Sequence, residues 1–452
     1  MAKETLMKST SGVRGIVGQG LDPTLALAYG AALGEVLGKG RVVVGRDSRP
    51  SGPMLSRAAI AGLTAVGRDV VDVGMVPTPT VEIAVKKLGA AGGICITASH
   101  NPAPWNALKF FNNRGEFITP AEYKKLDHAF ERARHNWVSA SDVGRVDQHS
   151  HWIDEHVNLA LRVKGVARRA VRHRRYKVVV DAINGAGSSA LPRLLDKLGC
   201  TVIGINCNGD GHFTHEPEPV AQNLRALSRA VRKHGADVGL ACDPDADRLA
   251  LVDENGRPIG EELTLAIAIQ PVLMLRKGPV VINLSTSKVT ADVARDMGAG
   301  VYYCKVGESN VVAAMRSKRA VIGGEGNGGV IYPAFHSGRD SLIAAALVLS
   351  ALAKRRLSMS ELVDTLPKYY TMKTKAPLKA SFDRQLKEFE KDASKMLGKV
   401  KIDRRDGRRF DFDRGWVQIR TSNTEPIFRL IVETDNKNLT GELVDMVRRY
   451  FT

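Results

Sequence analysis

The feature that most constrains the fold of this chain is a strand–turn–helix–strand pattern that recurs at intervals of roughly a hundred residues. Each copy has an apolar run, a polar or glycine-rich turn, a helical segment and a second apolar run. The three helical segments end in Gly-x-x-Val, with the glycines at Gly67, Gly199 and Gly298. Glycine suits the left-handed backbone position that ends a helix, and the valine begins the next buried strand. Because alternating strands and helices build layered α/β sheets, the pattern predicts three related α/β domains.

The predicted elements of these units can be placed by residue number. Strands are expected at residues 41–44, 70–74, 92–96, 176–180, 201–205, 238–242, 280–284, 301–304 and 320–322. Asp22 and Pro23 form a helix start, since Asp caps a helix and Pro suits its first turn. Further helices are expected at residues 190–198 and 288–297.

The boundaries between the units are less strongly marked. A single domain with one long parallel sheet is an alternative, but the stretches near 144–151 and 253–258 are typical of boundaries. Beyond about residue 367, strands at 370–375, 415–420 and 427–432 gather around helices at 381–396 and 438–450, which predicts an α+β unit. The predicted fold class is therefore α/β, with three related α/β sandwich domains and a smaller C-terminal α+β domain around a central cleft. The expected domains are residues 1–150, 151–255, 256–368 and 369–452.

Composition favours a cytoplasmic protein with no membrane segment. The first residues lack the apolar stretch of a signal peptide. The longest apolar helix candidate, residues 342–353, is shorter than the ~20 residues needed to cross a bilayer. The five cysteines contain no CxxC pair, so they are expected to be buried free thiols rather than a disulfide framework or a zinc site.

The net charge of +18 calls for an explanation. The densest basic run, residues 162–177, contains Tyr176 as its single aromatic residue. Nucleic-acid binding would interleave basic and stacking aromatic residues, so the run is interpreted as a solvated connector on a protein with small anionic ligands. Binding to DNA or RNA stays the distant alternative. A monomer or a homodimer is expected.

The first motif with chemical potential is Thr-Ala-Ser-His-Asn-Pro at residues 97–102, directly after the buried strand 92–96. Catalytic groups of α/β folds lie at such strand ends. Taken alone, Ser99 and Asn101 could equally satisfy the hydrogen bonds of an ordinary turn.

The second motif places Asp243, Asp245 and Asp247 after the apolar strand 238–242. Three carboxylates at alternate positions can converge on one hard cation such as Mg²⁺, whereas without a cation their charges repel one another. An EF-hand is the rival interpretation, but Arg248 occupies the sixth position, where that loop requires glycine.

Two further loops have the composition of ligand sites. The glycine-rich run 323–329 carries Glu325 and Asn327, which suit sugar hydroxyls or an amino group, although a plain turn is the alternative. Residues 420–426, Arg-Thr-Ser-Asn-Thr-Glu-Pro, combine a guanidinium, hydroxyls and an amide, with Arg429 just beyond. This mixture favours a phosphate cradle over an ordinary turn.

These motifs, together with Ser-Gly-Val-Arg-Gly at residues 11–15, closely resemble the α-D-phosphohexomutase superfamily, in family order and over nearly the whole chain. The resemblance implies that Ser99 carries a phosphoryl group and holds Mg²⁺ together with the three aspartates. It implies a hexose 1,6-bisphosphate intermediate and hexose phosphates as substrates. Glu325 and Asn327 would bind the sugar. The residues expected to clamp its remaining phosphate are Arg420, Ser422, Asn423, Thr424 and Arg429.

The resemblance also implies roles for the cationic groups. Lys109 is the expected general acid/base, since a lysine crowded by cations can lose its proton near neutrality. His100 would assist it, and Arg14, Arg46 and Arg248 would stabilise the transferring charge. The chain has Ala107 where the family commonly has glycine.

The glycine-rich run 323–329 resembles one particular branch of the superfamily. Many relatives have Gly-Glu-x-Ser-Gly-His, whereas this chain has Asn327 and Gly329. His336 is a candidate replacement for the histidine, and a core or capping histidine is the equal alternative. The loop and the later residues 338–341 resemble the archaeal-type phosphoglucosamine mutases, a branch that also handles glucose and mannose phosphates. A metal-dependent sugar phosphatase is the nearest alternative activity.

Overall fold

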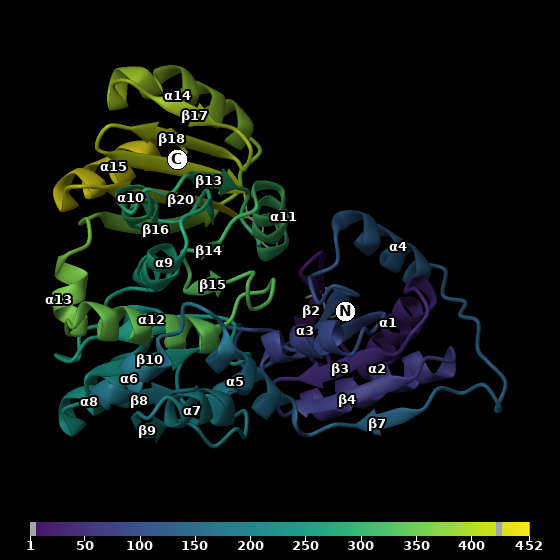
Figure 1. Cartoon of the computed structure of the whole chain (residues 1–452). Helices are drawn as coiled ribbons and strands as arrows, with labels where there is room; N and C mark the ends of the chain where they lie inside the picture. The colour runs from purple at the N-terminus through teal and green to yellow at the C-terminus, as the bar shows by residue number, and fades with distance from the viewer. Residues whose placement is uncertain (1–5, 422–426, 452) are drawn as a thin grey trace.

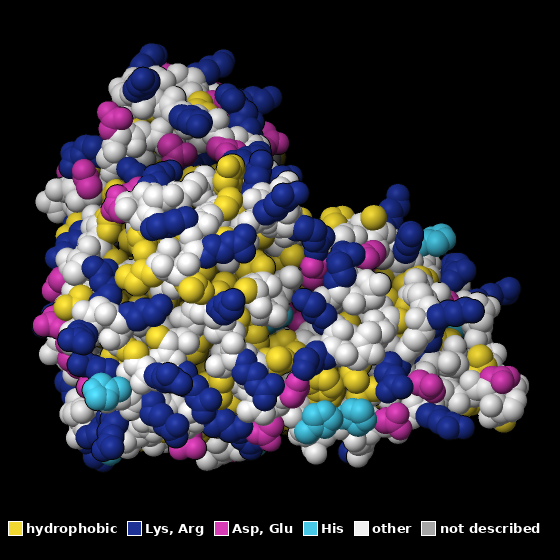
Figure 2. Space-filling view, viewed as in Figure 1, with side chains coloured by type: hydrophobic (Ala, Val, Ile, Leu, Met, Phe, Trp, Pro, Cys, Tyr) yellow, Lys and Arg dark blue, Asp and Glu magenta, His cyan; other side chains and the backbone are white. Residues whose placement is uncertain are grey.

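Within the residues that the structure describes, the strands form four separate sheets, of seven, four, four and five strands in chain order (Figure 1). The computed structural model describes residues 6–421 and 427–451. The predicted α/β fold class is confirmed, and a single long parallel sheet is excluded for the residues described. Figure 2 shows a notch between the part of the molecule that holds the fourth sheet and the part that holds the first.

The first unit contains β1 (Met7–Ser9), β2 (Gly12–Ile16), α1 (Pro23–Val36), β3 (Val42–Arg46), α2 (Gly52–Ala65), β4 (Val70–Met75), α3 (Thr78–Lys87), β5 (Gly92–Ile96), β6 (Trp105–Asn112), α4 (Pro120–Glu131) and β7 (Val146–Gln148). The second contains α5 (Trp152–Arg162), α6 (Arg168–Arg174), β8 (Lys177–Asp181), α7 (Gly187–Lys197), β9 (Thr201–Ile205), a 3₁₀ turn (Ala221–Asn223), α8 (Arg225–His234), β10 (Val238–Cys242) and β11 (Leu249–Val252).

The third unit contains α9 (Glu262–Leu275), β12 (Val280–Asn283), α10 (Lys288–Asp296), β13 (Val301–Cys304), α11 (Glu308–Lys318), β14 (Ile322–Glu325), β15 (Gly329–Ile331), α12 (Ser341–Arg355) and α13 (Met359–Asp364). The fourth contains β16 (Tyr370–Pro377), α14 (Phe382–Leu397), β17 (Lys401–Asp403), β18 (Arg408–Phe412), β19 (Gly415–Thr421), β20 (Ile427–Thr434) and α15 (Lys437–Tyr450).

The first three sheets contain the same arrangement of four neighbouring strands. The orders are β6-β5-β3-β4, β11-β10-β8-β9 and β15-β14-β12-β13, and each has three parallel strands and one antiparallel strand. The turn that leads from the third parallel strand into the antiparallel strand therefore occupies the same place in each unit. These three turns contain Ser99, the three aspartates and the end of the glycine-rich run.

The helix ends predicted from Gly-x-x-Val have the expected backbone. Gly67, Gly199 and Gly298 have φ of +79°, +82° and +76°, in the left-handed region that glycine adopts without strain. Asp22 caps α1 by accepting a hydrogen bond from the backbone N–H of Leu25. The five cysteines are free thiols; four of them are buried, and Cys207 is partly exposed.

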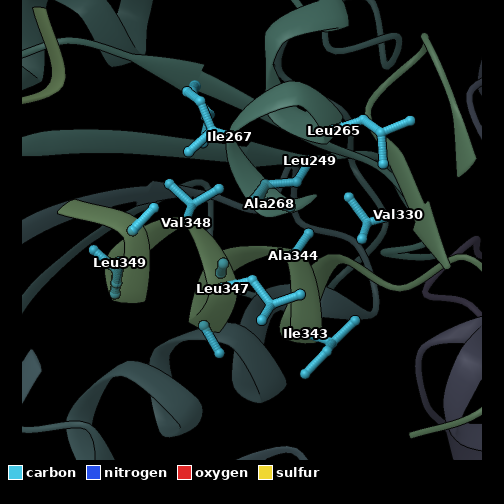
Figure 3. Packing of buried hydrophobic residues seen from close by; sticks show 14 of the residues in the cluster. Leu249, Leu265, Ile267, Ala268, Val330, Ile343, Ala344, Leu347, Val348 and Leu349 are labelled. Atoms are coloured by element: carbon cyan, nitrogen blue, oxygen red, sulfur yellow. The ribbon is translucent and has the colours of Figure 1, made fainter. Parts of the chain in front are cut away.

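The second and third units share one hydrophobic core. Helix α12 packs against α9 of its own unit and against α5, α6 and α7 of the second unit. Figure 3 shows Ala344 and Val348 of α12 on the side of the helix that faces Leu249 of β11 and Val330 of β15, while Ile343 lies on its other side. All these residues, and Leu347, belong to the same buried cluster. The shared core holds the turn after β10 and the β14–β15 hairpin at a fixed separation.

The fourth unit has its own core and attaches to the third through polar contacts. Arg409 donates to the carbonyl of Leu284 at 2.5 Å, and the hydroxyl of Ser285 donates to Gln418 at 2.6 Å. The backbone N–H of Lys288 donates to Glu433 at 2.7 Å. These contacts place β19 and β20 beside the end of β12.

The basic charge is distributed over the surface. Figure 2 shows Lys and Arg side chains spread across the visible face and interspersed with Asp and Glu. The Arg and Lys residues between 162 and 175, on and beside α6, are exposed. Within the described residues, no helix is long and apolar enough to cross a membrane.

Removing one buried side chain from α12 tests the shared core. Leu347→Ala is expected to lower the free energy of unfolding of the second and third units by about 2–5 kcal/mol, because it leaves a cavity where Leu347 is fully buried. Urea denaturation measures the change. Leu378→Ala, at a side chain that is 41% exposed, serves as the control and should change it by less than about 0.5 kcal/mol. Equal effects of the two substitutions would contradict the shared core.

Candidate active site

Ser99 lies between the first two units and faces the carboxylate triad. It is buried, and its Oγ donates a hydrogen bond to Oδ2 of Asp243 at 2.7 Å. Its φ of +50° is in the left-handed region, which is uncommon for serine and common in functional turns. The Nδ1 of His100 lies 3.3 Å from the same Oγ. The predicted serine turn and the predicted aspartate turn are therefore in direct contact.

Arg49 holds the serine turn in this conformation. Its guanidinium donates to the backbone carbonyls of Ser99 and Asn101 at 2.7 and 2.6 Å, and to those of Pro102 and Trp105. Asp47 pairs with Arg49 at 3.1 Å. Sequence reasoning assigned Arg49 no role, although its position in the polar loop after a predicted strand was a usable signal.

The three aspartates form a compact buried cluster. One oxygen of each lies within 4.8 Å of those of the other two. Oδ2 of Asp245 accepts from Thr78 and Lys109, both at 2.6 Å, and Oδ2 of Asp247 accepts from Arg339 at 2.6 Å. The Oδ1 atoms of Asp245 and Asp247 are buried without a hydrogen-bond partner in the part of the chain described. Two orphaned carboxylate oxygens beside the Ser99–Asp243 contact suit a hard divalent cation such as Mg²⁺.

The close packing of the three carboxylates shifts the pKa values of Asp243 and Asp245 in opposite directions. Burial, together with the charges of Asp247 and Asp245, raises the pKa of Asp243 well above its ordinary value. Burial alone would also raise the pKa of Asp245, but the Lys109 ammonium and its hydrogen bond outweigh it, so the pKa is lowered. The turn returns directly to strand β11 at Leu249, which excludes an EF-hand.

Lys109 has different neighbours from those expected. It lies on β6, and its Nζ is 2.6 Å from Asp245 and 3.7 Å from Asp247. Burial lowers its pKa, but these two carboxylates outweigh burial and raise the pKa above its ordinary value. The argument that crowding by cations lets Lys109 lose its proton was therefore wrong, because its contacts are anionic.

Arg14 and Arg248 form the cationic side of the site, and His100 lies close to both. Burial, Arg248 and Arg14 lower the pKa of His100 well below its ordinary value. Burial and Arg248 lower the pKa of Arg14 to about 10, and Arg14 donates to Asn101 at 2.6 Å. Arg248 lies 3.7 Å from Asp247, and its Nε has no hydrogen-bond partner among the described residues. A phosphate beside these groups would relieve their mutual repulsion.

The glycine-rich run forms the β14–β15 hairpin, next to the aspartate turn. Glu325 is buried, accepts from Asn283 at 2.8 Å and from the N–H of Gly307 at 2.9 Å, and binds Arg339 at 2.8 Å. Asn327 is partly exposed and accepts from the N–H of Gly329. The backbone N–H of Leu249 donates to the carbonyl of Gly328 at 3.0 Å, which joins the two turns.

His336 does not stand in for a histidine on the hairpin. Its Nε2 lies 2.9 Å from Asp340, and its Nδ1 accepts from the N–H of Gly338 at 3.1 Å. His156 of α5 binds the same Asp340 oxygen at 2.8 Å. His336 therefore belongs to a buried network that joins the second unit to the start of α12.

The phosphate-clamp residues are only partly described. Arg420 and Arg429 are directly opposite each other on β19 and β20. Burial lowers the pKa of Arg420, and Arg429 adds to this, while Asp406 and Glu325 oppose it. Two cations in register disfavour each other unless an anion lies between them. Ser422, Asn423 and Thr424 lie outside the described residues.

Comparison with known proteins decides which family has this arrangement. Four models of phosphoglucomutase/phosphomannomutase match in order: α/β/α domain I at residues 5–137, domain II at 154–256, domain III at 261–370 and the C-terminal domain at 372–449. The chain belongs to the phosphoglucomutase/phosphomannomutase family. This confirms the resemblance drawn from the motifs.

Relatives and solved structures of the family cover almost the whole chain. The phosphoglucomutase/phosphomannomutase of Thermococcus kodakarensis is 39% identical, over 97% of this chain and 96% of its own. A probable phosphoglucosamine mutase of Methanopyrus kandleri is 38% identical, over 97% of both. The crystal structure of a family protein from Burkholderia thailandensis has a TM-score of 0.85 and 30% identity, over 98% of this chain and 97% of its own.

The raised pKa of Asp243 predicts that cation binding at the triad depends on pH. A carboxylic acid must lose its proton to bind a cation, so Mg²⁺ affinity should rise with pH, and binding should release a proton wherever Asp243 is still protonated. Calorimetry in two buffers of different ionisation enthalpy measures the released proton. Identical heats in both buffers, with affinity independent of pH, would contradict the prediction.

Proposed function

We propose that this chain is a phosphohexomutase that interconverts hexose 6-phosphate and hexose 1-phosphate through a phosphoserine at Ser99 and a hexose 1,6-bisphosphate. The observation that carries the proposal is the contact of the Ser99 hydroxyl with the buried aspartate triad, in a chain that matches all four domain models of the family. Phosphoryl transfer depends mainly on positioning and charge neutralisation, and these are what the site supplies.

The residues fit a divalent cation at the triad. Asp243, Asp245 and Asp247, with the phosphorylated Ser99, would hold Mg²⁺, whose chemistry is to neutralise charge on the phosphate. The two orphaned Oδ1 atoms support this assignment. Arg14 and Arg248 supply further positive charge on the other side of the serine.

The transfer step moves one phosphoryl group and one proton. The bond between phosphorus and Ser99 Oγ breaks, a bond between phosphorus and a hexose hydroxyl oxygen forms, and the hydroxyl proton passes to a base. We assign the base to His100, because its lowered pKa keeps the imidazole neutral near pH 7. Lys109 stays protonated between Asp245 and Asp247 and keeps the triad in place. Return of the other phosphoryl group to Ser99 completes the isomerisation.

The hexose phosphate that does not react would be held by the fourth unit. Arg420 and Arg429 are proposed to bind it, together with Ser422, Asn423 and Thr424, while Glu325 and Asn327 face the sugar. The repulsion between the paired arginines supports an anion there. A second phosphate site also favours a mutase over a phosphatase, which needs only one.

We propose glucosamine phosphate as the natural substrate, and glucose or mannose phosphate as the alternative. The probable phosphoglucosamine mutase of Methanopyrus kandleri supports the first, and the phosphoglucomutase/phosphomannomutase of Thermococcus kodakarensis supports the second. Assaying glucosamine 6-phosphate, glucose 1-phosphate and mannose 1-phosphate side by side, with Mg²⁺ and a trace of bisphosphate, discriminates between them by kcat/KM.

Ser99→Ala is expected to abolish isomerisation, because it removes the only atom proposed to carry the phosphoryl group. Conversion of glucosamine 6-phosphate followed by ³¹P NMR measures the loss. Ser141→Ala, at an exposed serine of the same unit, should retain full activity. An unimpaired Ser99→Ala variant would reject the phosphoserine mechanism.

Arg420→Ala is expected to raise KM for both the 1-phosphate and the 6-phosphate by roughly 10–100-fold, because one charge-assisted hydrogen bond contributes about 1.5–3 kcal/mol. Initial rates in both directions measure KM. Arg414→Ala removes an exposed arginine of the same sheet that pairs with Asp435, and KM should not change. A KM that rises for one isomer alone would contradict a clamp shared by both orientations.

A further inference from the structure

Arg339 is a buried arginine that contacts three carboxylates from three different elements. Its Nη2 donates to Oδ2 of Asp247 at 2.6 Å, in the turn after β10. Its Nη1 donates to Oε2 of Glu325 at 2.8 Å, at the end of β14. Its Nε and backbone N–H donate to Glu308 at 3.0 and 3.1 Å, at the start of α11. One guanidinium therefore joins the aspartate triad to the β14–β15 hairpin, which is proposed to bind the sugar.

The contact with Arg339 decides which way the carboxylate of Asp247 faces. Oδ2 is held by the guanidinium, while Oδ1 is buried without a hydrogen-bond partner in the described residues. Asp245 is arranged in the same way, with Oδ2 held by Lys109 and Thr78 and Oδ1 left over. Cationic and hydroxyl groups outside the cluster thus hold one oxygen of Asp245 and one of Asp247 and leave the other oxygen of each for a ligand.

Gly329 provides the space through which the Arg339 side chain passes. A Cβ on residue 329 would lie 2.3 Å from Cδ and 3.0 Å from Cγ of Arg339, far inside van der Waals contact. Any side chain at residue 329 would therefore displace the arginine from Asp247 and Glu325. This gives a steric reason for Gly329, at the position where many relatives have the histidine of Gly-Glu-x-Ser-Gly-His.

We propose that Arg339 is a positioning residue for the cation at the triad, and that Gly329 is required because it makes room for Arg339. The inference rests on the proposed function for the identity of the cation as Mg²⁺. Groups that orient metal ligands from outside typically contribute 10–100-fold to metal affinity. Lysine is a point charge and cannot span three separate carboxylates as the planar guanidinium does.

The first test is Arg339→Lys, which keeps the positive charge and removes the planar guanidinium with its several N–H donors. Mg²⁺ affinity of the full chain, measured by calorimetry without any hexose phosphate, should fall by roughly 10–100-fold. Arg409→Lys makes the same change at a buried arginine of the fourth unit that is 1% exposed and should leave Mg²⁺ affinity unchanged. Unchanged Mg²⁺ affinity in Arg339→Lys would overturn the proposal.

The second test leaves the arginine in place. Gly329→Ala should weaken Mg²⁺ binding in the same range as Arg339→Lys, because the added methyl group pushes the guanidinium away. In the double variant the two losses should not add, since both remove the same contact. Additive losses, or normal Mg²⁺ affinity in Gly329→Ala, would show that the glycine does not serve the arginine.

These measurements separate the inference from the proposed function. If the wild-type chain binds Mg²⁺ but isomerises no hexose phosphate, the proposed function fails and the Mg²⁺ comparison between variants still decides the role of Arg339. If the wild-type chain isomerises hexose phosphates and Arg339→Lys binds Mg²⁺ normally, the positioning role alone fails.

Discussion

The structure depends on balancing three carboxylates that one short turn brings together in a buried position. Burying a single unpaired carboxylate costs several kcal/mol, and burying three side by side is more unfavourable still. Arg248, directly after the triad, lies 4.0 Å from Asp243 and 3.7 Å from Asp247, and the other compensating groups come from distant parts of the chain. Ser99, Thr78 and Lys109 belong to the first unit, and Arg339 belongs to the third. The first and third units therefore supply much of the compensation for the triad in the second unit, and the same contacts help to hold the three units together.

Repetition of one strand arrangement explains how these groups come to share a site. In each of the first three units the functional turn follows the third parallel strand and precedes the antiparallel strand. Ligand sites of α/β sheets lie at the carboxyl ends of parallel strands, so three copies facing one another bring three such ends to one place. The turns have diverged in chemistry: the first offers a hydroxyl, the second carboxylates and the third a glycine hairpin. The shared core built on α12 fixes the second and third turns relative to each other.

Local patterns in the sequence predicted most of the fold and the central groups of the site. Apolar runs and Gly-x-x-Val endings depend on neighbouring residues, and β9 and β13 have the predicted bounds. The aspartates were identifiable because their spacing within one turn forces them together. Contacts between distant parts of the chain were not identifiable in this way. Arg49, the anionic neighbours of Lys109, and the buried network that contains His336 all depend on which side chains meet after the units dock. Arg339 lies within residues 338–341, which resemble one branch of the superfamily, but its three carboxylate partners are 14 to 92 residues away in the sequence.

The positive charge of the site is concentrated in two separate places, which suits a reaction in which two phosphate groups are present. One concentration of positive charge, Arg14 with Arg248, lies beside Ser99, and burial and mutual repulsion lower the pKa of Arg14. A second concentration, Arg420 opposite Arg429, lies on the fourth sheet and is in turn close enough to Glu325 to be affected by its charge. Under the proposed function, phosphorylated Ser99 lies at the first concentration while a hexose monophosphate binds at the second, and a hexose bisphosphate meets both once Ser99 has given up its phosphoryl group. Two phosphate groups would then face the two concentrations of positive charge at each stage of the transfer, which would help to keep the bisphosphate bound while it turns over between its two orientations.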